Sequence, residues 1–376
     1  MSAASLASGV DAPSRLTITR PLDAMLREVA ERYPILGWAT PKNAASEQAR
    51  LLAAWRAGNQ ASPAWEPPGV DRRALAHSRR AIERARAALT DVGDRWIALY
   101  VDRLAECALD LEVIDASFTR AITDASRRRF GSDERDERAA DRLAAQWIAT
   151  PLPAATDETI ATDDERDARS LVSQMRRAIS AQRLGVRVLV RDRIGALAAA
   201  GDGVVIVARG RRTTAREVAR VVLHEIEGHV LPRERGRATT QELPGICTLG
   251  SAGASEDEEG RAICLEERAG LLEPKRRRSL AARHVAARIV ERGGSYVDVV
   301  RHLRGAGLAD DEALEVASRV QRGAYREGAA VVGGVARERV YLSAYVRVSA
   351  ATEGGRTLDS LGDARLSLAA RARLGS

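Results

Sequence analysis

The chain has 376 residues, enough to bury a large core, and because 45% of them are hydrophobic but only 3% aromatic, small aliphatic side chains must fill that core. A formal charge of +7 would suit nucleic acid, yet the arginines are interleaved with acids, and the basic runs 127–129 and 275–278 are short and lack several aromatic neighbours. Solvated helix faces are therefore the better interpretation, and nucleic acid is not expected as a partner.

Targeting and redox signals point to one compartment. The first twenty residues contain no apolar stretch long enough for a signal peptide, and no later segment is apolar enough to span a bilayer. The three cysteines, Cys107, Cys247 and Cys264, give no disulfide framework and fit a reducing environment. We therefore expect a cytoplasmic protein that does not insert into membranes.

The first half of the chain predicts helices that follow a disordered tail at residues 1–20. All five tryptophans lie in this half, which suggests that the region 21–184 builds a core of its own. Residues 150–164, rich in Thr and Asp after two prolines, indicate a linker or exposed loop. Helical periodicity is found at residues 21–33, 43–57, 70–91, 93–129 with a break, 133–149 and 164–184.

The pattern changes after residue 185. Residues 186–190 and 204–207 are runs of β-branched and aliphatic side chains that predict two strands, with a turn near Gly201. Helical patterns resume after Ser255 and continue to about Ala370. The fold is therefore expected to be mainly α with a small β-sheet, with a functional core at 185–350 and a C-terminal helical segment at 351–376.

The segment 224–229, His-Glu-Ile-Glu-Gly-His, holds two of the five histidines. Imidazoles are common zinc ligands, and a glutamate beside a zinc-bound water can take its proton. His224 and His229 are five residues apart, so on a regular α-helix they would point roughly 140° apart. A wider π-type turn would bring them together, and Gly228 is permissive there. The spacing thus predicts a locally widened helix with Glu225 as the base.

The alternative is that both histidines lie on a solvated surface helix. Thr214 and Glu217 form a capping-box pattern that starts a helix whose next turns are mostly apolar, including Val218 and Val221. A surface helix should not have this composition. Histidines on a largely buried helix need partners, because unpaired buried charge is expensive.

A third zinc ligand must come from elsewhere in the chain. In the segment 255–265, Ser255 and Glu258 form a second capping-box pattern, which would turn Glu258 back to the helix start. Glu259 shares its face with Ala262 and Ile263 and is the better ligand. Glu256 and Asp257 are expected to be first-turn acids that interact with the helix dipole. A thiolate ligand from Cys247 or Cys264 is conceivable, although buried structural thiols are commoner.

A His-Glu-x-x-x-His helix paired with a later Glu-Glu-Gly-x-Ala helix resembles the tyrosine carboxypeptidase family that includes the microtubule-associated enzymes and the bacterial QEGLA-motif proteins. The second motif matches residues 258–262, where Arg261 departs from the usual leucine. The resemblance implies a zincin-like metallopeptidase domain at 185–350, with a helical region before it. By the same resemblance, zinc would be bound by His224, His229 and Glu259, and Glu225 would be the general base.

Weaker similarities to the family occur at 33–47, 63–68, 319–323 and 335–342, so that the resemblance spans roughly residues 20 to 350. Removing a C-terminal residue requires a group that holds the free carboxylate, and arginine suits that task. Arg322 and Arg337 lie in two of these segments, and Tyr341 could assist the oxyanion or line an aromatic pocket.

The expected activity is zinc-dependent removal of a C-terminal, aromatic residue from a peptide or protein. Two alternatives stay open at this point. One is a metal-dependent endopeptidase. The other is a non-catalytic, metal-stabilised regulatory binding protein, against which the intact Glu225 argues because a structural site needs no base.

Overall fold

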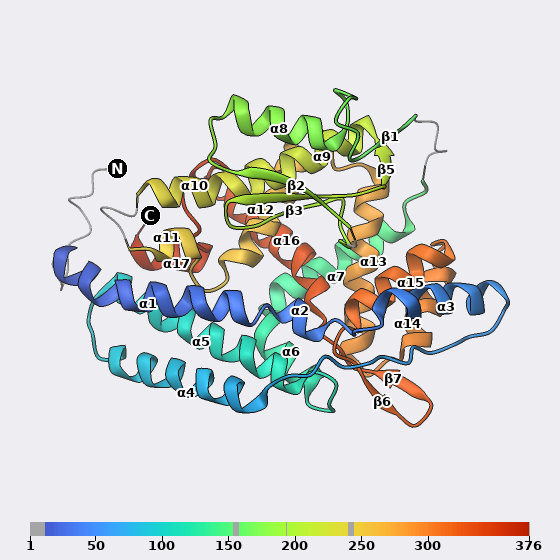
Figure 1. Ribbon diagram of the computed structural model, residues 1–376, viewed down its shortest axis with the longest axis horizontal. Coiled ribbons are helices and arrows are strands. Elements are labelled where there is room, and N and C mark those ends of the chain that lie inside the picture. Colours follow the sequence, from blue (N-terminus) through green and yellow to red (C-terminus); the bar gives the residue numbers. More distant parts are fainter. Residues whose placement is uncertain (1–11, 153–157, 193, 240–243, 376) are drawn as a thin grey trace. The chain divides into compact units, whose positions relative to one another are not determined.

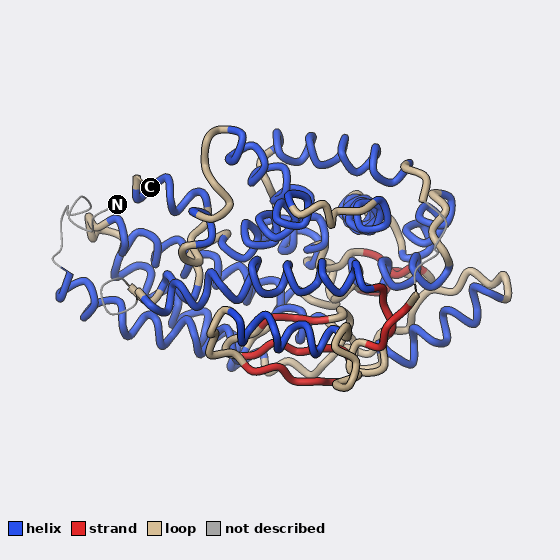
Figure 2. The backbone as a smooth tube through the Cα atoms, turned by 90° about the horizontal axis from the view of Figure 1, so that it is seen from above, coloured by secondary structure: helices blue, strands red, loops and turns tan. Residues whose placement is uncertain are grey.

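The computed structural model describes residues 12–152, 158–192, 194–239 and 244–375. With 63% of residues in helices and 7% in strands, the protein is mainly helical with small sheets, as the sequence predicted. Figure 2 shows how few strands accompany the helices. Contacts divide the chain into two compact units, each discontinuous in sequence: unit 1 comprises Met1–Thr150 and Arg277–Ser343, and unit 2 comprises Pro151–Arg276 and Ala344–Ser376.

Unit 1 is built almost wholly from helices, and in Figure 1 α1, α5 and α4 run side by side. Its elements are α1 (Ala12–Arg32), α2 (Ile35–Ala39), α3 (Ala44–Arg56), α4 (Arg72–Leu89), α5 (Arg95–Ala116), α6 (Ile122–Phe130), α7 (Glu134–Ala149), most of α13 (Pro274–Glu291), α14 (Tyr296–Gly305), α15 (Asp310–Val320), the hairpin of β6 (Tyr325–Glu327) and β7 (Ala330–Val332), and η3 (Arg337–Arg339).

The helices predicted at 43–57, 70–91, 93–129 and 133–149 are confirmed with small shifts at their ends, whereas α1 begins nine residues before the predicted start at 21 and α8 begins seven residues after the predicted start at 164. Asp71, Asp94 and Asp133 start α4, α5 and α7, because each side chain accepts hydrogen bonds from amides of the first turn. The expected tail at 1–20 was partly wrong: α1 already begins at Ala12, and of this tail residues 1–11 lie outside the described part of the chain.

The core of unit 1 joins segments that are far apart in sequence. Leu51 and Trp55 of α3 belong to one buried cluster with Val299 of α14 and Leu314 of α15. The helices of the first half therefore do not complete a core alone, contrary to what the tryptophan distribution suggested. They share it with residues about 250 positions later.

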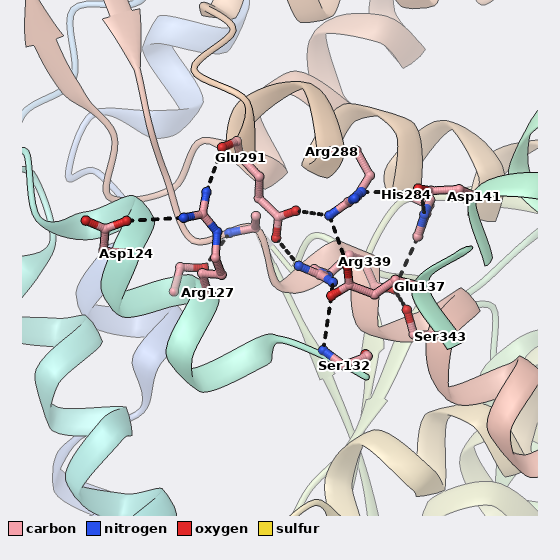
Figure 3. A network of polar contacts seen from close by, with 12 residues as sticks. Asp124, Arg127, Ser132, Glu137, Asp141, His284, Arg288, Glu291, Arg339 and Ser343 are labelled. Carbon is pink, nitrogen blue, oxygen red and sulfur yellow. Dashed lines mark hydrogen bonds and ion pairs between the residues drawn. The ribbon is translucent and has the colours of Figure 1, made fainter. Parts of the chain in front are cut away.

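A network of buried charges also ties unit 1 together (Figure 3). Arg339 is only 1% exposed and forms ion pairs with Glu137 of α7 and Glu291 of α13. Arg288 pairs with Glu291 at 2.7 Å. A buried arginine is tolerated only when its charge is matched, and these ion pairs match it while joining α7, α13 and η3.

Unit 2 consists of a small sheet and the helices that pack around it. Its elements are β1 (Thr159–Ala161), α8 (Leu171–Ala181), β2 (Arg187–Arg191), β3 (Ala198–Ala200), β4 (Val204–Ala208), β5 (Arg212–Thr214), α9 (Ala215–Leu223), the π-helix η2 (His224–Val230), α10 (Leu231–Ala238), α11 (Ile246–Leu249), α12 (Ala254–Arg268), most of α16 (Val340–Glu353), η4 (Ser360–Gly362) and α17 (Leu368–Leu374).

The three-stranded sheet has the order β2-β4-β3, with β2 parallel to β4 and β3 antiparallel to it. The two predicted strands are confirmed as β2 and β4. The edge strand β3 was missed because it consists of three alanines, which have low strand preference. Part of the expected linker is also a strand, since β1 pairs with β5.

One apolar core in unit 2 supports the helix that carries the histidines. Met175 of α8, Val205 and Val207 of β4, Val221 of α9 and Ile226 of η2 belong to one buried cluster. The sheet and α8 therefore enclose the apolar side of the α9–η2 helix (Figure 1). None of the described helices is long and apolar enough to cross a membrane.

Candidate metal centre

The histidine-bearing helix begins and widens where the sequence predicted. Thr214 caps α9, and its hydroxyl accepts a hydrogen bond from the Glu217 amide at 3.1 Å. At His224 the α-helix gives way to the π-helical stretch η2, which ends at Val230 and leads directly into α10. A π turn spans five residues, so His224 and His229 come to lie on the same side.

Buried surroundings exclude the solvated-helix alternative for these histidines. His224 is 7% exposed, and the two imidazole rings meet edge to face with centroids 5.1 Å apart. A side chain at Gly228 would not fit, because its Cβ would lie 2.7 Å from the Ala262 Cβ of α12. The glycine therefore lets α12 approach the widened turn.

Helix α12 starts two residues earlier than predicted. Its first residue, Ala254, follows Gly253, whose φ of 75° turns the chain into the helix, and the Ser255–Glu258 capping box is wrong. Glu258 instead turns inward and accepts hydrogen bonds from Arg365, at 2.6 Å from Nε. Glu256 and Asp257 lie in the first turn, as expected.

The structure brings together the three side chains that the sequence proposed as ligands. The donor atoms of His224, His229 and Glu259 all lie within 4.8 Å of one another. The distance between the two Nε2 atoms is 3.4 Å, and Glu259 Oε2 lies 3.4 Å from His224 Nε2 and 3.7 Å from His229 Nε2.

These distances fit zinc. Ligands at about 2.0–2.2 Å from a tetrahedral ion are about 3.3–3.6 Å apart, which is close to the three edges of this triangle. The Glu259 and His229 side chains keep 12% and 16% of their surface exposed, which is compatible with an open fourth position for water. The donor set, two imidazoles and a carboxylate, is one that catalytic zinc sites use.

A carboxylate behind His224 orients its ring. His224 Nδ1 lies 2.7 Å from Glu266 Oε1, and Glu266 is fully buried. Arg220 and Arg276 donate to Glu266 at 2.8 and 3.0 Å, which keeps it ionised. Nδ1 is therefore placed to carry the proton, so that the lone pair of Nε2 faces the donor triangle, as is usual for zinc-binding histidines.

The electrostatics of the triangle favour a cation. Burial would raise the pKa of Glu259, but hydrogen bonds from His224 and His229 outweigh burial and hold this pKa well below 4.5. Burial would lower the pKa of His229, but Glu258 and Glu259 outweigh it and hold this pKa well above 6.5. The carboxylates that favour a proton on the imidazoles would equally favour a metal ion at the same point.

Glu225, the predicted base, is held by the edge of the sheet. Its Oε2 accepts a hydrogen bond from the amide of Ala200 in β3 at 2.8 Å. The edge strand β3 therefore lies beside this helix. Glu225 is 9% exposed and lies next to His224 in the chain without belonging to the donor triangle.

The three predicted substrate-binding residues belong to unit 1, whereas the donor triangle belongs to unit 2. Arg322 and Arg337 are among four arginines around the buried Glu338. Arg337 Nη1 lies 3.5 Å from Tyr341 Oη, and the guanidinium carbon of Arg283 lies 4.0 Å from the centre of the Tyr341 ring. The structure thus groups the three residues in one positively charged cluster.

Sequence reasoning missed the residues that support the ligands. Glu266 follows Glu259 by seven residues, or two helical turns, and this spacing could have placed both on one face of α12. Arg365, the partner of Glu258, lies more than a hundred residues later and gave no local signal.

Cys264 is not arranged as a ligand. Its Sγ lies 3.8 Å from Ser349 Oγ, and burial raises the pKa of the thiol to about 11. A thiolate is therefore disfavoured, and the structural interpretation of this cysteine holds. Cys107 and Cys247 are also buried, and neither forms a disulfide bond with a described residue.

Comparison with known proteins gives one match. Neither the curated proteins nor the solved structures contain a significant match to the chain. The family model for microtubule-associated tyrosine carboxypeptidases matches residues 57–366. This match spans most of the chain and includes both motifs of the donor triangle. The chain therefore belongs to the microtubule-associated tyrosine carboxypeptidase family.

Proposed function

We propose that this protein is a zinc-dependent carboxypeptidase that removes a C-terminal, aromatic residue from a peptide or protein. Family membership implies a carboxypeptidase. The observation that carries the zinc dependence is the triangle of His224, His229 and Glu259 donor atoms with edges of 3.4, 3.4 and 3.7 Å. A helix that supplies two histidines beside an edge strand also supports the zincin-like fold as part of the proposal.

The proposed roles follow from the positions of the side chains. A zinc ion held by the triangle would supply Lewis acidity and lower the pKa of a coordinated water toward about 7. Glu225 would accept the proton from that water and return it to the leaving amine. Its hydrogen bond from Ala200 fixes one carboxylate oxygen and leaves the other for this transfer.

We further propose that the arginine cluster of unit 1 holds the carboxylate of the substrate, with Arg322 and Arg337 as its donors. One buried glutamate, Glu338, faces four arginines, so the cluster has an excess of positive charge. A guanidinium can grip a carboxylate with two parallel hydrogen bonds. Tyr341, with its ring against Arg283, offers an aromatic surface next to these donors.

Metal analysis tests the zinc site directly. Purified protein should hold one zinc ion per chain, and His229→Ala should lose it, because two donors cannot retain the ion. Glu225→Gln should retain zinc but lose peptidase activity. If Glu225→Gln hydrolyses C-terminal peptides as well as the parent does, the role of Glu225 as base is wrong.

Peptides that differ only at their ends separate the proposal from both alternatives. A carboxypeptidase should cleave a peptide with a free C-terminus and leave the same peptide untouched when its terminus is amidated, whereas an endopeptidase would cleave both. A binding protein would cleave neither. Varying the last residue and reading the products by mass tests the aromatic preference.

A further inference from the structure

Arg261 is buried beside the widened turn although family resemblance would place a leucine there. It lies on α12 and is 2% exposed. Burial lowers its pKa to about 10, which still leaves it charged at neutral pH. A charged side chain in this position must be compensated by hydrogen bonds. Arg261 has them: Nε donates to the carbonyl of Leu358 and Nη1 to the carbonyl of Glu227, both at 2.6 Å.

The carbonyl of Glu227 lacks the main-chain hydrogen-bond donor that a π-helix would normally provide. In a π-helix each carbonyl accepts from the amide five residues later. The amide of Leu231 donates to Ile226 in this way. The next carbonyl, that of Glu227, would need the amide of residue 232, but residue 232 is proline and has no N–H. Arg261 supplies a hydrogen bond that the main chain cannot make.

The loop on the other side of Arg261 leaves room for the guanidinium group. A Cβ at Gly362 would lie 2.3 Å from Arg261 Nη2 and 2.5 Å from Cζ, so no other residue could occupy this position without moving the arginine. Arg261 therefore links three segments of unit 2: α12, the π turn, and the loop that contains Leu358 and Gly362.

We propose that Arg261 is a positioning residue that fixes the π turn in the register required for metal binding. Glu227 lies between His224 and His229, and the turn must stay five residues wide for their Nε2 atoms to meet at 3.4 Å. By satisfying the Glu227 carbonyl, Arg261 stabilises the wide turn against an α-helical turn, which would separate the histidines. This inference rests on the proposed zinc site.

Substitutions of Arg261 test this role. Arg261→Met keeps the length but donates no hydrogen bond, and we expect about 10–100-fold weaker zinc binding, the usual effect of losing a supporting contact. Arg261→Lys keeps a charged donor and should recover part of this loss. The matched control is Arg268→Met on the same helix, because Arg268 is exposed and pairs with Asp359 of the same loop. It should bind zinc like the wild type.

Three readouts separate positioning from general stability. Zinc affinity is measured by competition with a chelator, site geometry by the visible absorption of the Co²⁺-loaded protein, and stability by thermal unfolding of the metal-free protein. A merely structural role for Arg261 would lower the unfolding temperature but leave the zinc affinity and the Co²⁺ spectrum unchanged. That result would overturn the inference.

The single variant Gly362→Ala gives an independent check that does not require Arg261→Met to fold, and a double-mutant cycle that combines the two substitutions gives a further one. The added methyl should displace the guanidinium and weaken zinc binding about as Arg261→Met does. In an Arg261→Met background Gly362→Ala should have little further effect, because contacting residues couple. Fully additive effects would contradict the inference. A wild type without zinc would overturn both the proposed function and the role of Arg261, whereas equal zinc binding by wild type and Arg261→Met would overturn only the latter.

Discussion

The imidazole of His224 is oriented by Glu266, a carboxylate outside both motifs. The Glu266 carboxylate accepts a hydrogen bond from His224 Nδ1 at 2.7 Å, and this contact decides which ring nitrogen faces the donor triangle. Arg220 and Arg276 hold the carboxylate in turn. The orientation of His224 therefore depends on ion pairs that link Arg220 in α9, Glu266 in α12 and Arg276 in the first turn of α13.

Replacing this carboxylate by an amide should weaken metal binding. We expect Glu266→Gln to bind zinc about 10–100-fold more weakly, because the histidine loses an ionised acceptor. Chelator competition measures the effect. Glu267→Gln is the matched control, since the neighbouring carboxylate accepts from Tyr345 Oη at 2.7 Å and not from His224. Equal losses in both variants would argue against an orienting role for Glu266.

The charge on Glu338 should stabilise unit 1 in a pH-dependent way. Burial would raise the pKa of Glu338, but Arg283 and three further arginines outweigh it and hold this pKa at about 2, below the usual 4.5. The folded state thus favours the ionised form by about 3 kcal/mol. This stabilisation is complete above about pH 4.5 and is lost as the pH falls toward 2.

Urea unfolding followed by tryptophan fluorescence tests this effect, because all five tryptophans lie in unit 1. Glu338→Gln should lower the free energy of unfolding by about 3 kcal/mol at pH 7 and by only about 1 kcal/mol at pH 3. Glu83→Gln, which breaks an exposed pair with Arg79, should change it by less than about 1 kcal/mol at either pH. A loss that does not depend on pH would contradict the assignment.

At the level of single residues, the sequence predicted the position of a side chain where a local rule, such as a shared helix face, determines that position. The position of Glu259 beside the two histidines could be predicted because it shares a helix face with apolar residues, and its role as a ligand stays a prediction. Glu258 could not be assigned correctly, because the turn at Gly253 and the distant Arg365 decide its direction. The predicted roles of Arg322, Arg337 and Tyr341 stay predictions, since they depend on a bound substrate.

Among the elements, the widened helix was predictable from histidine spacing, but its close contact with α12 was not. Three consecutive alanines likewise could not be recognised as β3, although this strand holds Glu225. In both cases the decisive contact is made at a small residue, Gly228 in η2 and Ala200 in β3. Small residues permit such contacts, but the sequence does not reveal which small residues make them.

The contact between α12 and α16 can be tested at Gly260. A Cβ there would lie 2.4 Å from the carbonyl oxygen of Ala344, so Gly260→Ala must push the two helices apart. We expect a loss of about 1–3 kcal/mol of stability and weaker zinc binding, because the adjacent Glu259 moves with α12. Thermal unfolding and chelator competition measure the two effects.

Gly305→Ala is the control for this substitution, since Gly305 is also helical but has open space around it. It should leave zinc binding unchanged and alter stability by at most about 1 kcal/mol. If Gly260→Ala behaved like Gly305→Ala, the close helix contact would not be what positions Glu259.

On the scale of the whole molecule, each unit is assembled from two separate stretches of chain. The domain boundaries predicted from the sequence, at residues 20, 184 and 350, stay a prediction about which parts of the chain carry the function. Its folding consequence can be tested, because Leu51 and Trp55 pack against Val299 and Leu314. Local patterns reveal helices, but they cannot reveal that a helix completes its core with residues so far along the chain.

A fragment of residues 1–184 should therefore not fold cooperatively. Without α14 and α15 the apolar face of α3 is left uncovered, and burial worth several kcal/mol is lost at these side chains alone. We expect red-shifted tryptophan fluorescence, binding of a hydrophobic dye and a broad thermal transition. A sharp transition with native-like fluorescence would show that the first half folds independently.

The interleaved order of the two units also has a consequence for protein synthesis. The segment of unit 1 that ends at Thr150 is synthesised before the segment Arg277–Ser343 that completes its core. At roughly 5–20 residues per second, translation of the about 190 residues after Thr150 takes about 10–40 s. During this interval the nascent helices α1 to α7 expose apolar surface, so chaperones that bind such surface should associate with the chain until the segment up to Ser343 has been synthesised.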